Sequence, residues 1–545
     1  MASVRHMSWL LAAALVIGCA GPLDPVPDPS HEPSQEPASQ DPVSEDPSEE
    51  PSESPSTLVL AAPTELSLEE EGDGIVLTWK DNSVKEEGYL VEKEGPSSEK
   101  KYIPANSETW IDPSVEPGVW TYTVKAYKGL ERGEGASVEY VKSTPARMSV
   151  SVQTSSYMAA VRVIIDDDGA SGCKSGVCWS TEENPTVDSE SWEYPKGLTT
   201  GKSYYALLRG LEQGVKYYVR AWARSAGNLY YSAQKQLILD DEPSALNAQW
   251  TEVKDYSLPS SVKLYKSSTS VTGSKVNMWR AEADFSAGDI ELRTLKGGTS
   301  LKTLSAFVTS ELKDEKVYVV TNGGYFFTPY GSYSYIVDRG NVLAKNVASL
   351  NREESYFVAR GAFGLDENMT PSIWWVYNST DTWAYDEPLP IYDGGPVLRP
   401  TADFPCEALV WEPYEAMGGG PVLVRDGRIC FDFLKSSSGK YLSNTELFQS
   451  DIFASGLKAP RTAVGYKPDG KVVLLVADGR NSGGSAGLTL DELARIMKGL
   501  GCSDVLNLDG GGSTMMTVGS APVLLNSPSD GKERAVYSYM AIVGK

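Results

Sequence analysis

The chain is nearly free of histidine. Its 545 residues include only His6, close to the N-terminus, and His31, in a proline-rich tract. The rest of the sequence therefore has no imidazole for a Ser-His-Asp or Cys-His nucleophile, or for a histidine-ligated zinc or iron site. Acid or base chemistry in this chain must use Asp, Glu, Tyr or Lys.

Basic residues are also in deficit. The chain has 49 Lys and Arg against 73 Asp and Glu, which gives a formal net charge of −24. A nucleic-acid partner would call for a basic surface, so we predict none. Ten of the acidic residues lie within positions 20–57, a stretch with no Lys or Arg.

Long apolar runs are lacking as well. The longest, LLAAALVIG at residues 10–18, is too short to span a bilayer and follows a short n-region that contains Arg5. It leads into VIGC, which resembles the bacterial lipobox. We therefore predict a signal peptide at 1–19, lipidation of Cys19 and an exported lipoprotein that its lipid anchor holds at the membrane, in the periplasm or on the cell surface.

Few cysteines remain after Cys19. Their number is odd, and they are Cys173, Cys178, Cys406, Cys430 and Cys502. An exported location permits disulfides between Cys173 and Cys178 or between Cys406 and Cys430, although spacing alone does not establish the pairing. Cys502 follows a predicted helix and is expected to be a buried small hydrophobe.

The sequence changes character four times along its length. Residues 20–60 form a Pro, Ser and acid tract that predicts a disordered tether. Short alternating strands in 61–143 resemble a fibronectin type III module with Trp79 and Tyr122 in its core, and 144–240 resemble a second β-sandwich module. We interpret both modules as spacers or docking units. Residues 245–545 have a mixed pattern with glycine-rich loops.

The predicted fold class is multidomain, with two all-β immunoglobulin/fibronectin III-like sandwiches followed by an α+β mixed-sheet catalytic domain. In the last domain, residues 461–480 predict two strands joined by the turn at 468–470. Thr489 and Glu492 predict a capping box on a helix that Gly501 ends, with apolar residues on one face. The strand DVLNL follows this helix.

That strand leads into LNLDGGGSTMM, residues 506–516, where a carboxylate precedes three glycines and two hydroxyls. No Gly-Lys-Ser/Thr follows, which excludes a P-loop, and the next residues predict a strand, which excludes a dinucleotide fingerprint. The remaining reading is a tight turn whose N–H groups form an anion-binding nest. For an isolated DGGG, the favoured interpretation is a purely structural turn that Asp509 caps and whose glycines let two strands cross closely.

Four other polar, glycine-flanked segments at strand ends favour a site over a structural turn. They are TNGGYF at 321–326, RTAVG at 461–465, DGR at 478–480, and NSPSD at 526–530 with Arg534. With GGGPVLVRDG at 418–427 and the order of all these motifs, residues 254–545 resemble the phosphodiester glycosidases. This family hydrolyses the bond between an anomeric carbon and a phosphodiester oxygen, which the resemblance makes the expected activity here.

The resemblance and the residue types together define the expected site. Asp509 is the predicted central carboxylate, as a base on water or a stabiliser of the sugar cation, and Asp478 is the second catalytic candidate. The predicted substrate-binding residues are Asn322, Gly323, Arg461, Thr462, Arg480, Asn507, Gly510, Gly511, Gly512, Ser513, Thr514, Asn526 and Arg534. The three arginines are candidate phosphate clamps, with surface or structural ion pairs as the alternative.

No organic cofactor is expected. Clustered Asp and Asn oxygens would suit calcium, but EF-hand spacing is missing and no metal is predicted. Substrates are expected among sugar-1-phosphodiesters of glycans or envelope polymers. The aromatics that could stack on their sugar rings, with core packing as the alternative role, are Tyr330, Tyr333, Tyr335, Trp374, Trp375 and Trp383.

Two other functions stay open at this level. The first is a non-catalytic surface protein that binds glycans or sugar phosphates without cleaving them. The second is a glycosidase with no phosphate requirement.

Overall fold

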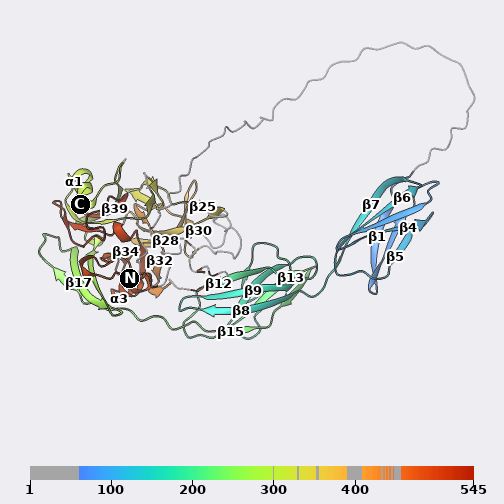
Figure 1. Cartoon of the computed structure of the whole chain (residues 1–545), viewed down its shortest axis with the longest axis horizontal. Helices are drawn as coiled ribbons and strands as arrows, with labels where there is room; N and C mark the ends of the chain where they lie inside the picture. Colours follow the sequence, from blue (N-terminus) through green and yellow to red (C-terminus); the bar gives the residue numbers. More distant parts are fainter. Residues whose placement is uncertain are drawn as a thin grey trace, which may run out of the picture. The chain divides into compact units, whose positions relative to one another are not determined.

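The computed structural model describes residues 60–545 except 299, 328–330, 352–354, 389–407, 431–433, 436, 438, 440, 443–445 and 447–455 (Figure 1). The chain divides into two units, residues 1–58 and residues 59–545. The predicted signal peptide, the lipidation of Cys19, all but the last residue of the tether, Cys406 and Tyr330 lie outside the described residues. The described chain is mostly β-sheet, and no helix in it is long and apolar enough to cross a membrane.

The first group of strands forms two antiparallel sheets around an aromatic core. Trp79 and Tyr122, the predicted core residues, are both buried there. Burial alternates along the strand that carries Tyr122, as expected for a strand with one face on a core. One sheet has the order β1 (Thr64–Glu71), β2 (Gly74–Lys80), β5 (Thr109–Asp112), and the other has the order β4 (Ser98–Pro104), β3 (Gly88–Glu94), β6 (Gly118–Lys128), β7 (Glu131–Lys142). The likeness to fibronectin type III modules stays a prediction, as do the domain boundaries.

The second group also forms two antiparallel sheets. One has the order β12 (Ser203–Leu208), β9 (Ala159–Asp167), β8 (Arg147–Thr154), and the other has the order β11 (Glu190–Glu193), β10 (Lys174–Ser180), β13 (Tyr217–Ser225), β14 (Asn228–Tyr231), with β15 (Lys235–Leu237) paired to β13. Cys173 and Cys178 are both buried, free thiols, so their predicted pairing is wrong. Five residues of extended chain separate their Cα atoms by roughly 16 Å, far beyond disulfide reach.

The C-terminal region contains three large sheets. The eight-stranded sheet has the order β16 (Thr251–Val253), β17 (Val262–Val271), β18 (Ser274–Ala283), β35 (Val472–Ala477), β34 (Arg461–Tyr466), β36 (Asp504–Asn507), β32 (Val422–Arg425), β33 (Arg428–Ile429). The five-stranded sheet has the order β19 (Ile290–Lys296), β39 (Ser538–Gly544), β20 (Val317–Asn322), β37 (Met516–Val518), β38 (Val523–Leu524). The seven-stranded sheet has the order β24 (Asn341–Ala344), β23 (Ile336–Asp338), β31 (Glu415–Gly418), β27 (Arg360–Leu365), β28 (Pro371–Asn378), β29 (Thr382–Tyr385), β30 (Ala408–Val410).

Smaller elements complete this region. The hairpins are β21 (Phe326–Phe327) with β22 (Gly331–Ser332), and β25 (Ser349–Asn351) with β26 (Ser355–Phe357). The α-helices in the described residues are α1 (Leu304–Glu311) and α3 (Leu490–Gly499), and the 3-10 turns are η1 (Phe285–Ala287), η2 (Ser482–Gly484) and η3 (Gly511–Ser513).

The prediction of a mixed sheet is wrong for the described residues of this region, because all of their strand pairs are antiparallel. Helix α3 does cross from β35 to β36, the kind of connection that parallel strands need. However, β34 lies between those two strands and is antiparallel to both, so the crossover produces no parallel neighbours.

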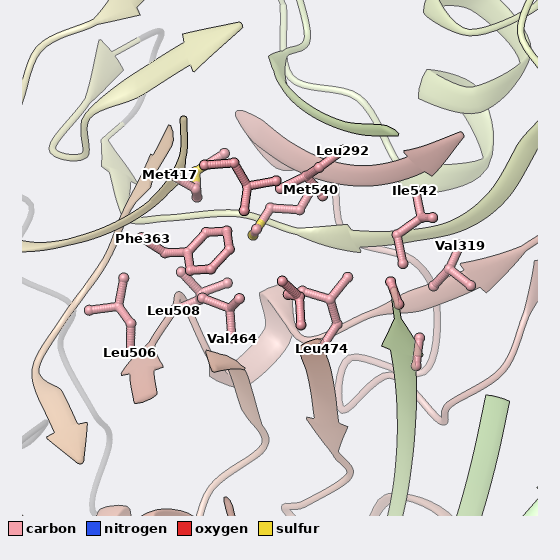
Figure 2. Close-up of a cluster of buried hydrophobic side chains, with 14 of the residues drawn as sticks. Leu292, Val319, Phe363, Met417, Val464, Leu474, Leu506, Leu508, Met540 and Ile542 are labelled. Atoms are coloured by element: carbon pink, nitrogen blue, oxygen red, sulfur yellow. The ribbon is translucent and has the colours of Figure 1, made fainter. Parts of the chain in front are cut away.

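The inner faces of the three sheets meet in one hydrophobic core (Figure 2). Each of the three sheets contributes side chains that are at most a few per cent exposed. The packing of all three sheets is therefore stabilised by the same core. The labelled members are Leu292, Val319, Met540 and Ile542 from the five-stranded sheet, Phe363 and Met417 from the seven-stranded sheet, and Val464, Leu474, Leu506 and Leu508 from or beside the eight-stranded sheet.

The opposite face of the eight-stranded sheet packs on α3. Leu490, Leu493, Ile496 and Met497 bury the apolar side of this helix in a second core. The predicted capping box is confirmed, because the Thr489 hydroxyl accepts from the N–H of Glu492, whose carboxylate accepts from the N–H of Thr489. The predicted strand pair at 461–480 is confirmed as β34 and β35. The sheet thus has a core on both faces, and it holds the end of β36 firmly in place.

Candidate functional site

The three glycines come directly after β36, in the middle of the eight-stranded sheet. Gly511 has φ of +60°, in the left-handed region that favours glycine, and its N–H donates to the carbonyl of Pro460 at 2.9 Å. A Cβ on Gly510 would lie 2.8 Å from that same carbonyl oxygen. The first two glycines are therefore needed by the turn itself.

The third glycine leaves space for neighbouring side chains. A Cβ on Gly512 would lie 2.5 Å from Oδ2 of Asp530 and closer still to the guanidinium of Arg534. The Arg480 guanidinium lies in a similar way over Gly511, with Nη2 3.0 Å from where a Cβ would be. The glycines thus let two guanidinium groups lie close to the backbone of the turn.

Asp509, the predicted central carboxylate, stands at the entrance to this turn. Its backbone is fixed on both sides, because its N–H donates to Gly323 O at 3.2 Å and its carbonyl accepts from Asn322 Nδ2 at 2.7 Å. Burial raises the pKa of the half-buried Asp509 side chain to about 6, against the opposing effects of hydrogen bonds from Ser513 and from the Gly510 N–H. Its carboxylate therefore titrates close to neutral pH.

Arg461 is the most unusual charge in the site. It begins β34, is only 6% exposed, and donates to two backbone carbonyls, Leu488 O at 3.0 Å and Leu457 O at 3.1 Å. No carboxylate in the described part of the chain lies within ion-pair distance of it. Burial and the nearby charge of Arg480 lower the pKa of Arg461.

The other two predicted phosphate clamps differ in their partners. Arg480 is exposed and forms no ion pair with any described residue. Arg534 is held by Asp530, whose Oδ2 accepts from Nε at 2.9 Å and from Nη2 at 2.6 Å. The predicted alternative of a structural ion pair therefore describes part of the role of Arg534, whereas Arg461 and Arg480 have no counter-charge in the described chain.

A buried network lies behind Asp509. Asn322 ends β20, and its Oδ1 accepts from the Thr462 hydroxyl at 2.9 Å and from Met515 N at 3.2 Å. The hydroxyls of Thr462 and Thr514 are 3.3 Å apart. Three segments far apart in the sequence, at the ends of β20 and β36 and in β34, are locked together here. These predicted binding residues hold the backbone of Asp509 in position.

Asn507 and Tyr325 form a second buried contact. The Asn507 amide donates to the Tyr325 hydroxyl at 2.9 Å and to the carbonyls of Gly420 and Leu508, while the Tyr325 hydroxyl donates to Gly420 O at 2.9 Å. The Oδ1 atom of Asn507 is buried without a hydrogen-bond partner among the described residues. Burial, followed by the charge of Asp509, raises the pKa of Tyr325. Our sequence reasoning missed Tyr325, whose only signal was its place in NGGYF.

Asp478, the second predicted carboxylate, is buried and holds the segment after β38. Its Oδ1 accepts from Asn526 Nδ2 at 3.1 Å and from Ser527 N at 2.9 Å, and burial raises its pKa to about 6. Asn526 also bonds the backbone of Thr514 and Met516. These contacts are structural, and a catalytic role for Asp478 stays a prediction.

The described aromatic residues that could stack on sugar rings differ in exposure. Tyr335 and Trp375 are buried in cores, and Trp374 and Trp383 are partly buried against them. Tyr333 is exposed. The alternative role of core packing thus accounts for Tyr335 and Trp375.

Together these residues form an anion site beside a carboxylate. The Ser513 hydroxyl and the Gly510 N–H donate to the Asp509 carboxylate, the guanidinium groups of Arg480 and Arg534 lie over the glycine turn, and Arg461 is close enough to Arg480 for their charges to interact. Such donors bind phosphate oxygens, and the carboxylate can take a proton or stabilise a cation. Among the described residues, no group of three or more His, Cys, Asp or Glu is placed to hold a metal ion.

Comparison with known proteins gives a matching family and a curated relative. Residues 315–543 match the family of phosphodiester glycosidases. An uncharacterized SPbeta prophage-derived protein of Bacillus subtilis (strain 168) is 38% identical over 86 residues, which are 16% of this chain. The match spans 13% of the length of that curated relative.

Two solved structures are also similar in part. The zebrafish N-acetylglucosamine-1-phosphodiester alpha-N-acetylglucosaminidase catalytic domain, auto-inhibited by its pro-peptide, is 19% identical with a TM-score of 0.35 and matches over 55% of this chain and 88% of its own. A hypothetical protein from Synechocystis is 13% identical with a TM-score of 0.36 and matches over 88% of this chain and 96% of its own.

Proposed function

Residues 315–543 belong to the phosphodiester glycosidase family, and on that basis we propose that the protein hydrolyses the glycosyl-phosphate bond of sugar-1-phosphodiesters. Water adds to the anomeric carbon, the bond from that carbon to the phosphodiester oxygen breaks, and the phosphomonoester leaves with the bonding electrons. The products are a free sugar and a phosphomonoester. The substrates would be glycans or envelope polymers that carry such linkages.

The observation that carries this proposal is the buried charge of Arg461. An unpaired guanidinium that is 6% exposed costs several kcal/mol of desolvation unless an anion compensates it. The described chain supplies only two carbonyls, and Arg480 adds a second unpaired positive charge nearby. A phosphate group would supply the counter-charge to both. A glycosidase with no phosphate requirement would gain nothing from this arrangement.

The chemistry divides between the two sides of the scissile bond. A phosphate leaving group already carries negative charge, so guanidinium and N–H donors can stabilise its departure without protonating it. On the sugar side, an ionised Asp509 would accept a proton from water or stabilise the oxocarbenium-like transition state. Asn322 and Thr462 would fix the position of that carboxylate through the backbone of the turn.

The location of the protein is part of the same proposal. The predicted signal peptide and Cys19 support export and a lipid anchor, and the acidic tether supports a folded region carried away from the membrane surface. Such a protein would act on material in the periplasm or outside the cell. Labelling with a lipid precursor, with and without Cys19→Ala, tests the anchor directly.

The reaction is tested by phosphomonoester release from a panel of sugar-1-phosphodiesters. The full-length protein should turn over at least one substrate, Asp509→Asn should lose turnover, and Asp469→Asn, in the exposed turn after β34, should keep it. A protein that binds these substrates without cleaving them would be the non-catalytic alternative. Comparable turnover of ordinary aryl glycosides would contradict the phosphate requirement.

A further inference from the structure

The hairpin that follows the site carries an exposed aromatic pair, Phe327 and Tyr333. Three aromatic side chains of the described chain rank as exposed large hydrophobics, and these are two of them, with exposed fractions of 44% and 36%. Their ring centroids are 4.8 Å apart and their planes are tilted by 48°. Exposed aromatics that gather and touch one another, away from any core, form a binding surface more often than scattered ones do.

The backbone of the hairpin is shaped around the Phe327 ring. Gly331 lies opposite Phe327 in the strand pair β21–β22, and a Cβ there would lie 2.5 Å from Cε2 of that ring and closer still to Cζ. The glycine therefore lets the ring lie flat across the partner strand. One face of Phe327 is covered in this way, while 44% of the side chain stays exposed to solvent.

The same hairpin is tied to the candidate site. Tyr333 N donates to Tyr325 O at 3.0 Å, and the Tyr325 hydroxyl accepts from Asn507 at the end of β36. Asn322, four residues before Phe326, holds the backbone of Asp509. The aromatic pair thus lies on the segment that follows Asn322, and the Tyr333 end of the hairpin is bonded to Tyr325 of the site.

We propose that Phe327 and Tyr333 form a platform that binds a pyranose ring of the substrate. This inference rests on the proposed function, which supplies a sugar beside the phosphate site. Pyranose rings present apolar C–H faces that stack on aromatic side chains, whereas the proposed function assigns the phosphate to the arginines beside the glycine turn. The platform would select for the saccharide, and the arginines would select for the phosphate.

The test measures the binding of the sugar and the binding of the phosphate separately. Phe327→Ala and Tyr333→Ala should each raise KM for a turned-over sugar-1-phosphodiester roughly 3- to 10-fold and leave kcat within about twofold. They should raise the Ki of the matching methyl glycoside by the same factor and leave the Ki of inorganic phosphate unchanged. Tyr102→Ala is the matched control, because Tyr102 is an exposed aromatic that contacts Tyr127 in the first sandwich.

The outcomes separate this inference from the proposed function. Turnover by the wild type with unchanged KM and glycoside Ki in both variants would overturn the platform and leave the function standing. Equal increases in the Ki of glycoside and phosphate would also overturn it, since the hairpin would then only shape the site. If no substrate is turned over, NMR titration with methyl glycosides decides: binding that the two variants lose supports the platform, and no binding to the wild type overturns it.

Discussion

Gly512→Ala should lower the catalytic efficiency that depends on the glycine turn while leaving the stability of the fold nearly unchanged. The φ of Gly512 lies outside the left-handed region, so an alanine is compatible with the backbone. Its Cβ would instead overlap the guanidinium of Arg534 and lie 2.5 Å from Oδ2 of Asp530, and both groups are ends of side chains. To restore van der Waals contact, that guanidinium must move by on the order of 1.5 Å. We therefore expect a displaced arginine on an intact fold.

The expected loss of folding stability is smaller than the expected loss of transition-state binding. The ion pair between Arg534 and Asp530 is partly exposed, and such pairs contribute about 0–1 kcal/mol, which the lower entropy of the unfolded alanine chain offsets in part. A charge-assisted hydrogen bond to phosphate contributes about 1.5–3 kcal/mol. Gly512→Ala should thus change the free energy of unfolding by less than about 1 kcal/mol and lower kcat/KM about 10- to 150-fold.

The assay combines urea unfolding with steady-state phosphomonoester release. A double-mutant cycle supplies the control, because in an Arg534→Ala background only the Asp530 carboxylate is left for the added alanine to displace, and its effect on kcat/KM should be much smaller than in the wild type. Wild-type kinetics in Gly512→Ala would refute the assignment of Arg534 to the phosphate. A large loss of stability would show that the collision reaches the backbone.

Three further predictions follow from other charges. Arg480→Ala removes an exposed guanidinium that has no ion pair among the described residues, so stability should stay within about 0.5 kcal/mol while KM and the Ki of inorganic phosphate rise together about tenfold. Equal values in wild type and variant would contradict its role. Burial raises the pKa of Asp509 to about 6 although the Arg534 charge lowers it, so kcat/KM should rise with pH through about 6, and Arg534→Ala should move this rise to higher pH. Burial raises the pKa of Glu415 from 4.5 to about 8, so its contribution to stability is complete below pH 4.5 and is lost as pH rises through 8. Unfolding of Glu415→Gln should lack this pH dependence, although the amide loses one of the N–H bonds from Thr294 and Arg339 and lowers stability at acidic pH.

Local patterns in the sequence were sufficient to predict much of the fold around the site. The helix that begins after Thr489 and ends before Gly501 follows from a capping box and a helical period, both of which act within one or two turns. The strands on both sides of the turn at 468–470 follow from equally local signals. The LDGGGS turn itself was recognisable because three glycines in a row have a high entropic cost and need a reason.

The partners of individual side chains were not predictable in this way. Arg461, Arg480 and Arg534 look equivalent in the sequence, but the first is buried with no carboxylate partner in the described residues, the second is exposed, and the third is paired with Asp530. Asp478 and Asp509 both precede glycine, yet Asp478 bonds the segment after β38. These differences depend on which strands become neighbours, and the crossover of α3 past β34 is set by the packing of the whole domain.

The shortage of histidine agrees with the charge distribution of the site. An alcohol leaving group would need a proton donor near neutral pH, the usual task of a histidine or of a carboxyl group with a raised pKa. A phosphate leaving group needs positive charge instead, and arginine supplies it at every pH in the working range. Asp509, with its pKa of about 6, is then free to act in its ionised form on the sugar side. If arginine stabilises the leaving group and ionised Asp509 acts on the sugar, kcat/KM should rise with pH through the pKa of Asp509. It should then stay constant at higher pH, because no protonated acid is required. A bell-shaped profile would require a second titrating group, and Asp478 is the carboxyl group in the described site whose pKa would make it the first to examine.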